Sequence, residues 1–227
     1  MTMKDVLDEL AAVRRKMGTA TLPAGEAYTM ELRRRYDAHL DDVWDAITSP
    51  ERLSRWMKPV TGDLHLGGAF ELDGGEHGEI LRCEPPRLLR VSWMFGPGAD
   101  EWPGTSEVEV RLSPGSAGDT EFELVHAAAV GEPMFPTYGP GAGGVGWDLR
   151  LLTLARFLGD GEVLDHEEFR ASPAGHEFSR RSAAAWGEAH LAGGGEPDQV
   201  AAAVEATTTF YLPTGDATDR ASGSTLS

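Results

Sequence analysis

One of the seven histidines in the chain, His126, lies in a sequence pattern that could support chemistry. Within residues 121 to 126, the residues Phe122, Leu124 and His126 alternate with two glutamates and a valine, which is typical of a strand with one buried face. His126 is therefore expected to point inward. Two interpretations stay open: a core histidine hydrogen-bonded to a neighbour, or a polar group that orients a ligand or transfers protons in a mostly apolar pocket.

Other residue types give weaker indications of chemistry. The histidines show neither H-x-x-x-H nor H-E-x-x-H spacing, and His166 lies in an acidic stretch expected at the surface, so we expect no metal site. No Gly-x-Ser-x-Gly elbow is present. The single cysteine, Cys83, excludes an intrachain disulfide and is expected to be a small buried side chain without a catalytic partner. We assign no catalytic residue.

Residues 139 to 144 read Gly-Pro-Gly-Ala-Gly-Gly, which matches the G-x-G-x-x-G spacing of dinucleotide-binding loops. That motif requires a preceding hydrophobic strand, which is missing here, and Pro140 removes a backbone donor that phosphate would need. We therefore expect no cofactor. The Gly- and Pro-rich residues 127 to 146 instead predict an exposed, mobile loop beside a pocket.

Large aromatic residues occupy positions that would converge on the inner side of a curved sheet. Their density predicts a cavity of roughly a few hundred cubic ångströms, although ordinary core packing would explain each position equally well. The candidate ligand-binding residues are Trp56, Phe70, Trp93, Phe95, His126, Trp147, Leu151 and Leu154.

The elements that would position these residues are strands, two short helices and one long helix. Period-two alternation recurs over residues 28 to 36, 88 to 95, 107 to 112 and 121 to 126, which indicates an antiparallel sheet. Residues 42 to 56 form two short helices separated at Ser49-Pro50. In a helix from 146 to 158 the apolar face contains Trp147, Leu151 and Leu154, and a polar stripe contains Arg150, Thr153 and Arg156.

Several motifs follow one another in the order of a known superfamily. They are Asp-Val-Trp-Asp-Ala-Ile-Thr-Ser-Pro-Glu-Arg-Leu-Ser-Arg-Trp at 42 to 56, Gly-Asp-Leu-His-Leu-Gly-Gly-Ala-Phe-Glu-Leu at 62 to 72, and His-Gly-Glu-Ile-Leu-Arg-Cys-Glu-Pro-Pro-Arg at 77 to 87. Over residues 26 to 160 the chain resembles START-like (SRPBCC) domains, in particular homologues of the activator of the heat-shock-protein-ninety ATPase. The resemblance implies an α+β helix-grip fold, an antiparallel sheet of about six strands around a long helix.

The resemblance leaves three functions open, because this fold serves many unrelated activities. The leading expectation is a protein that binds a small apolar or aromatic molecule without catalysis. The alternatives are a chaperone-interacting ATPase activator and an aromatase/cyclase-type enzyme that acts on polyketides. The sequence shows no distinctive acid/base pair for the enzyme, and whether any reaction is catalysed stays open.

Segments flank this domain on both sides. We expect a helix over residues 3 to 17 and a linker over 18 to 25, then the START-like domain over 26 to 160. A helical extension covers 161 to 212, with helices beginning near Ser172-Pro173 and Glu196-Pro197, and residues 213 to 227 are expected to be disordered. The extension is too apolar to stay in water, so it packs on its own domain or, alternatively, in a homodimer.

Composition restricts the partners. The 227 residues contain 20 Lys and Arg against 37 Asp and Glu, a formal charge of -17, which argues against nucleic acid and anionic membranes. No apolar run approaches the roughly 20 residues of a membrane span. The amino terminus lacks the pattern of a signal peptide, so we expect a cytoplasmic protein.

Overall fold

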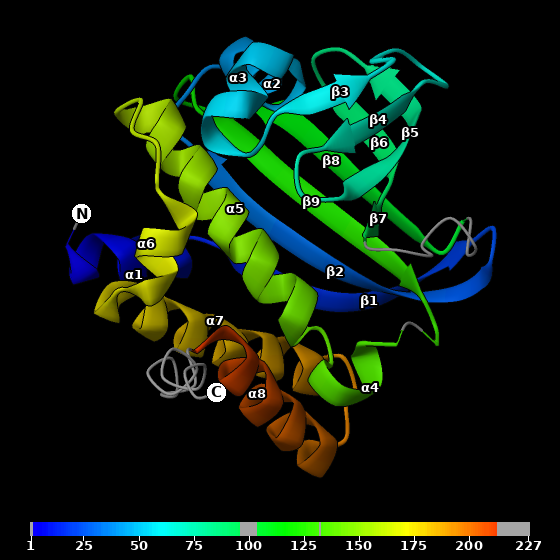
Figure 1. The fold of residues 1–227 in the computed structure, drawn as a ribbon, viewed down its shortest axis with the longest axis vertical. Helices are drawn as coiled ribbons and strands as arrows, with labels where there is room; N and C mark the ends of the chain where they lie inside the picture. The colour runs from blue at the N-terminus through cyan, green and yellow to red at the C-terminus, as the bar shows by residue number, and fades with distance from the viewer. Residues whose placement is uncertain (1, 96–103, 132, 213–227) are drawn as a thin grey trace, which may run out of the picture.

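A curved antiparallel sheet runs through the computed structural model, which describes residues 2–95, 104–131 and 133–212. In the described residues it has nine strands, and β7 (Met94–Phe95) pairs with β5 outside the main order (Figure 1). The main order is β1 (Arg14–Leu22), β2 (Gly25–Tyr36), β9 (Thr120–Ala129), β8 (Ser106–Pro114), β6 (Leu88–Ser92), β5 (Glu76–Glu84), β4 (Ala69–Leu72) and β3 (Val60–Gly62).

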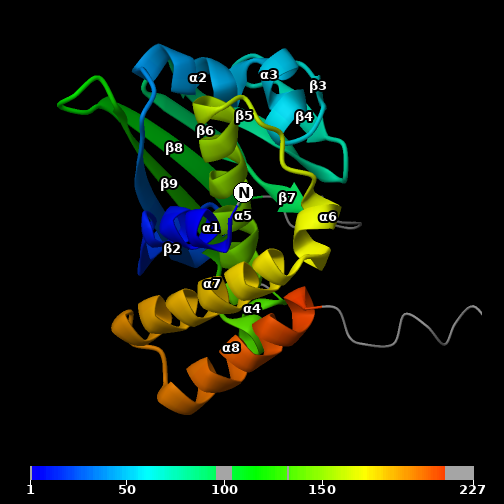
Figure 2. The same ribbon diagram turned by 90° about the vertical axis from the view of Figure 1, so that its left-hand side faces the viewer.

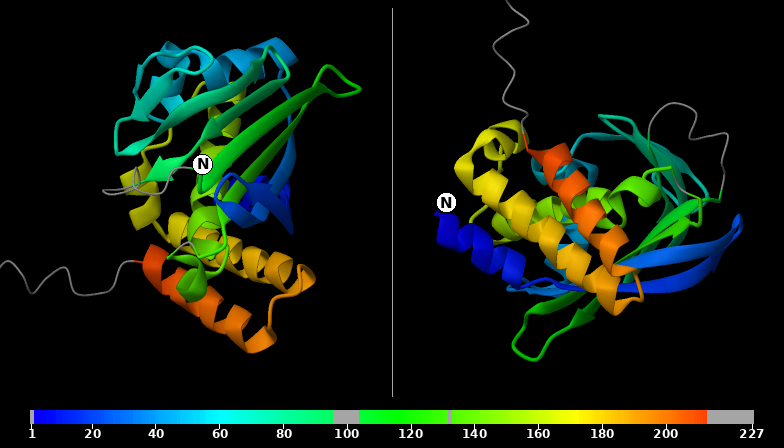
Figure 3. Two further views of the ribbon diagram at one scale, coloured as in Figure 1. Left: turned by 90° about the vertical axis from the view of Figure 1, so that its right-hand side faces the viewer. Right: turned by 90° about the horizontal axis from the view of Figure 1, so that it is seen from below.

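Helices cover the inner face of this sheet and pack along its β1 edge (Figure 1). The long helix α5 (Gly141–Gly159) lies across the concave face, and α2 (Leu40–Thr48) and α3 (Pro50–Trp56) close one end (Figure 1). A second group lies beyond α5, as Figures 2 and 3 show: α1 (Met3–Ala11), α4 (Phe135–Tyr138), α6 (His166–Ala171), α7 (Pro173–Ala192) and α8 (Pro197–Tyr211). The predicted helix-grip architecture is confirmed. None of the described helices is both long enough and apolar enough to cross a membrane.

Two of the predicted strands are interrupted. The motif over 62 to 72, which the resemblance implies is one strand, contains the last residue of β3 and all of β4, and these strands pair with each other as a hairpin. The segment 88 to 95 contains β6 and β7, with Trp93 between them. These breaks and the additional strand β1 account for the difference between about six predicted strands and nine described ones.

The prediction for residues 12 to 25 was wrong. The expected helix ends at Ala11, and residues 14 to 22, expected as helix and linker, form β1. This strand pairs with β2 from Arg14↔Arg33 to Leu22↔Gly25, and Gly25 has a φ of 124°, which glycine tolerates in the hairpin turn. A full ladder of cross-strand hydrogen bonds outweighs the weak helical preference of this segment.

The predicted exposed loop over 127 to 146 was wrong at both of its ends, whereas most of the described residues from 130 to 138 are exposed. β9 continues to Ala129, and the glycine run forms the first turns of α5. A Cβ atom at Gly141 would lie 2.3 Å from the Thr207 hydroxyl oxygen, and one at Gly144 would lie 2.4 Å from the Trp186 ring. The glycines therefore allow α7 and α8 to approach the backbone of α5 closely, and they do not form a lid.

The predicted polar stripe of the long helix is largely covered. Thr153 is fully buried, and its hydroxyl donates to the Leu149 carbonyl oxygen at 2.9 Å. The outer side of α5 is apolar as well, because Val145, Leu149 and Leu152 pack in one cluster with Phe178 and other residues of α1 and α7. The helix is thus held between the sheet and the carboxyl-terminal helices.

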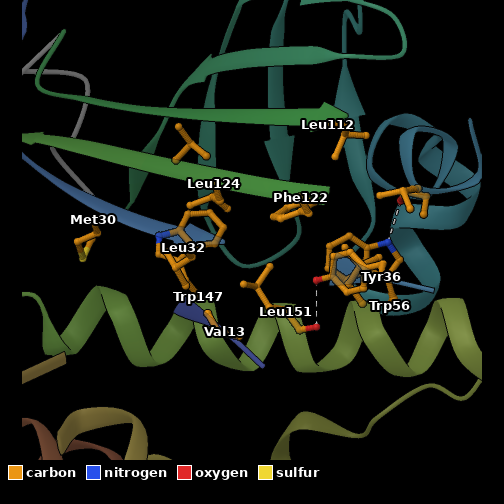
Figure 4. Packing of buried hydrophobic residues seen from close by; sticks show 14 of the residues in the cluster. Val13, Met30, Leu32, Tyr36, Trp56, Leu112, Phe122, Leu124, Trp147 and Leu151 are labelled. Atoms are coloured by element: carbon orange, nitrogen blue, oxygen red, sulfur yellow. Dashed lines mark hydrogen bonds between the residues drawn. The ribbon is translucent and has the colours of Figure 1, made fainter. Parts of the chain in front are cut away.

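The main core lies between the concave face of the sheet and α5, as Figure 4 shows. The Tyr36 hydroxyl donates to the Leu151 carbonyl oxygen at 3.3 Å, and the Trp56 indole donates to the Ala46 carbonyl oxygen at 2.8 Å. Both bonds join polar tips of large aromatic side chains to backbone acceptors inside an apolar core.

The prediction of two packed helices in residues 172 to 211 is confirmed. Trp186 and Phe178 of α7 are fully buried, and Val200 of α8 is 3% exposed. These helices pack on α1, α5 and β1 of their own domain. Phe210 of α8 is 50% exposed and does not share this burial. The homodimer alternative stays a prediction, as does disorder in residues 213 to 227, which lie outside the described residues.

Candidate functional site

Four of the predicted ligand-binding residues form a connected ring cluster. The centroids of Trp93 and Trp147 are 5.2 Å apart, and Phe70 lies 6.2 Å from Trp93. The His126 ring lies edge-on to Trp147 at 5.8 Å. Strands β4 and β9, the junction of β6 and β7, and helix α5 thus each contribute one ring.

The other predicted residues lie elsewhere. Trp56 of α3 is buried near Tyr36 (Figure 4). This pair and Trp147 lie at different places along α5, and Leu151 lies between them (Figure 4). Leu154 is buried on α5 in the same core. Phe95 was expected to face inward but is 70% exposed, because β7 is only two residues long and pairs with β5 alone.

The structure does not confirm the predicted large cavity among the described residues. The rings of Trp93 and Trp147 are in contact in the space that they were expected to line. One small space of about 10 Å³ lies elsewhere, between α4, α5, α7 and α8. A surface hollow of about 180 Å³ lies on β1 and β2 and is lined by Arg14, Arg15, Lys16, Glu31 and Arg33.

His126 is held by two hydrogen bonds that fix its tautomer. The Trp147 indole N–H donates to Nδ1 at 3.0 Å, so Nδ1 carries no proton, and Nε2 carries the proton that it shares with the Ser106 hydroxyl at 2.8 Å. Burial and the nearby Arg150 charge lower the pKa of His126 to about 4. A neutral histidine that donates to the serine does not activate it, so this pair is not a nucleophile and base.

Arg150 is the charged residue of this cluster. Its guanidinium carbon lies 5.1 Å from the Trp147 ring centroid and 5.7 Å from that of Trp93, which allows cation–π attraction to both. It donates to the carboxylate of Glu76, which Lys58 also contacts at 3.2 Å. Glu76 is 5% exposed, so its charge requires these partners. Burial lowers the pKa of Arg150, and Glu76 opposes that shift.

The carboxyl-terminal extension contributes two titratable groups beside Arg150. The Tyr211 hydroxyl of α8 donates to the Ala142 carbonyl oxygen at 2.6 Å, and burial raises the pKa of Tyr211. Burial and the charge of Arg150 lower the pKa of His166 on α6. His166 is half-buried next to the cluster, whereas the sequence predicted a surface position.

Metal and thiol chemistry gain no support from the described ranges. No group of three His, Cys, Asp or Glu side chains within them could hold a metal ion. Cys83 was expected to be buried but is exposed, because it follows a register shift in β5 between Ile80 and Arg82.

Sequence reasoning missed Arg150, Glu76 and Lys58 as members of the cluster. A signal for Arg150 exists, because it lies three residues after Trp147 and therefore on a neighbouring part of the same helix surface. The pairing with Glu76 joins residues 74 positions apart, which no local pattern indicates.

Comparison with known proteins places the chain in a family. Residues 37–159 match the family model described as "Activator of Hsp90 ATPase homolog 1-like protein". The crystal structure of CalU16 from Micromonospora echinospora is similar, with 39% identity, a TM-score of 0.61, and 78% of this chain and 98% of CalU16 covered. The solution structure of CalU16 gives 37% identity, a TM-score of 0.66, and 80% and 97% covered.

A more distant structure shares the fold alone. The protein EF2215 from Enterococcus faecalis has 12% identity and a TM-score of 0.58, with 83% of this chain and 99% of that protein covered. No curated protein matches the chain. From the family match and the similarity to CalU16, the chain belongs to the family of Activator of Hsp90 ATPase homolog 1-like proteins.

Proposed function

We propose that this protein binds a small aromatic or apolar molecule, without catalysis, at the cluster formed by Phe70, Trp93, His126, Trp147 and Arg150, called here the indole–guanidinium cluster. The observation that carries the proposal is the position of Arg150 across the faces of two tryptophans. Sites for small molecules combine aromatic walls with a few polar groups that fix orientation, and this cluster has that composition.

The contact between Trp93 and Trp147 is compatible with binding. Trp93 is only partly buried, whereas Trp147 is 6% exposed, so Trp93 is the more accessible residue of the pair. An aromatic pair contributes roughly 0.5–1.5 kcal/mol beyond the burial of its area. A ligand ring inserted between the indoles would replace that contact with two similar ones, which offsets part of the cost of opening the pair.

Three features support binding over catalysis. Both nitrogens of His126 are engaged by Trp147 and Ser106, which leaves no free lone pair to accept a proton from a substrate. The low pKa of His126 also removes it as an acid near neutral pH. Arg150 binds and orients an acceptor but holds its proton too firmly for general acid catalysis.

Titration of the purified full chain with aromatic compounds of one to three rings tests this function by calorimetry. We expect saturable binding that Trp93→Leu weakens about tenfold, because ring stacking is lost. Trp44→Leu is the control, since Trp44 is another partly buried tryptophan, on α2. Absence of binding throughout the panel, or equal affinities of the two variants, would contradict the proposal. Native mass spectrometry of the purified protein complements the panel by identifying a co-purified molecule.

A further inference from the structure

Arg150 has hydrogen-bonding capacity that the protein does not use. A guanidinium group has five N–H donors. Among the described residues the one hydrogen-bond acceptor of Arg150 is the Glu76 carboxylate. The Arg150 side chain is 24% exposed, and none of its nitrogens is both buried and without a hydrogen-bond partner, so the remaining donors face solvent and are open to a ligand. Unused donors on a largely buried arginine favour a ligand that brings its own acceptor atoms.

The local charge balance is positive. Glu76 is a single carboxylate between two cations, Arg150 at one side and Lys58 at the other. The titratable neighbours His126, His166 and Tyr211 add no charge near neutral pH, because the lowered pKa values keep both histidines neutral and the raised pKa keeps the tyrosine neutral. The cluster therefore carries one uncompensated positive charge in a chain whose formal charge is -17.

Of the acidic residues around the cluster, Asp165 acts on His166, and Asp148 is already paired. Asp148, two residues before Arg150 on α5, is paired with Arg15 at 2.9 Å and also accepts hydrogen bonds from α7. Arg170 lies over the Tyr211 ring at 5.6 Å and adds a further cation on the side of the extension. A ligand with a negative group would be attracted, and a second cation would be repelled.

We propose that the indole–guanidinium cluster binds an aromatic carboxylate, with the ring between the tryptophans and the carboxylate on Arg150 and Lys58 beside Glu76. The planar guanidinium donates two parallel hydrogen bonds to a carboxylate, which a neutral hydroxyl group does not match. Lys58, whose side chain is 39% exposed, extends the positive charge toward solvent and marks the side from which the carboxylate enters. This inference rests on the proposed function and specifies the ligand class of the same site.

Matched pairs of probes test the inference on the full chain. Calorimetry compares 2-naphthoate with 2-naphthalenemethanol, and benzoate with benzyl alcohol, at pH 7 and low salt. We expect each acid to bind about tenfold more tightly than its alcohol, with a preference that falls as salt is added. Equal affinities for acid and alcohol would overturn the inference and leave the proposed function standing, whereas no binding of any probe would count against both.

Variants identify the residue responsible. Arg150→Gln should remove the preference for the acids, measured as the ratio of the affinities of each acid and its alcohol within the same variant. Lys58→Met should reduce the preference about threefold, because this amine is partly exposed. Arg156→Gln, on the same helix and paired with Glu162 and Asp160, is the control that should keep the preference. A preference retained by both Arg150→Gln and Lys58→Met overturns the inference. Near-ultraviolet circular dichroism establishes that each variant is folded, and Lys58→Met decides the test if Arg150→Gln does not fold.

Discussion

The Trp147 indole N–H donates a hydrogen bond of 3.0 Å to His126 Nδ1 and so joins the long helix to the central strand β9. The bond requires an unprotonated Nδ1, and protonation of His126 would place two N–H groups against each other. Burial and the Arg150 charge act in the same direction, and they lower the pKa of His126 to about 4. The two residues therefore link the protonation state of one side chain to the packing of α5 on the sheet.

This link predicts a pH-dependent stability. Because the folded pKa of about 4 lies below the ordinary value of 6.5, the unfolded chain binds a proton first as the pH falls. The contribution of His126 is fully present above pH 6.5 and is lost between pH 6.5 and 4, by about 3 kcal/mol. Urea denaturation of the wild type and His126→Gln at pH 7 and pH 4.5 measures the difference. An equal loss of stability in both proteins would contradict the assignment.

The buried pair of Arg15 and Asp148 should be important for stability. Asp148 is 1% exposed and accepts hydrogen bonds from Arg15 of β1 and from Ser182 and Trp186 of α7. Arg15→Met leaves this carboxylate without its cation and should lower the free energy of unfolding by about 3–5 kcal/mol. Arg33→Met removes the exposed pair with Glu123 on the next strand and should cost at most about 1 kcal/mol. Similar costs in urea denaturation would contradict the special role of Arg15.

Glycines in α5 differ in what a side chain would contact. Gly144→Ala would place Cβ 2.4 Å from the Trp186 ring, so we expect a loss of about 1–3 kcal/mol from overpacking. Gly159→Ala, at the end of the same helix, has no heavy atom within 4 Å and should stabilise by up to about 1 kcal/mol. Thermal unfolding followed by circular dichroism compares them. A neutral Gly144→Ala would mean that α7 does not lie as close to α5 as described.

Removal of the carboxyl-terminal extension should expose the outer face of α5. Truncation after Asp160 removes the residues of α7 that cover Val145, Leu149 and Leu152. We expect a lower melting temperature or aggregation, since these side chains would each lose burial of roughly 1.5–3 kcal/mol. Size-exclusion chromatography and thermal unfolding measure both effects. A monodisperse truncated protein with an unchanged melting temperature would show that the extension is dispensable.

Much of the fold follows from local sequence patterns. Where the structure differs from the predictions, the cause is a contact with residues far along the chain. The alternation of Phe122, Leu124 and His126 identifies β9 because the inward positions repeat every second residue. Residues 14 to 17 continue a helical pattern, and only pairing with β2 makes them a strand. The glycine run at 139 to 144 resembles a loop until Trp186 and Thr207, far along the chain, are placed against it.

The candidate site likewise has a part that local sequence patterns predict and a part that they do not. Inward positions of Phe70, Trp93 and Trp147 follow from strand and helix periodicity. The contact of Arg150 with both indoles and with Glu76 does not, because it depends on where α5 crosses the sheet. Cavity size is equally inaccessible to sequence patterns, since it depends on side-chain rotamers that packing selects.

The central claim, a small-molecule site at the indole–guanidinium cluster, is tested most directly by the tryptophan indole N–H signals in nitrogen-15 NMR spectra during titration with 2-naphthoate. We predict saturable shifts of the Trp93 and Trp147 signals, assigned through Trp→Phe variants. The signal of Trp186 should stay in place, because that indole donates to Asp148 at 3.1 Å on the other side of α5 and serves as an internal reference. Spectra in which neither the Trp93 nor the Trp147 signal moves, or in which all indole signals shift equally, would contradict the account.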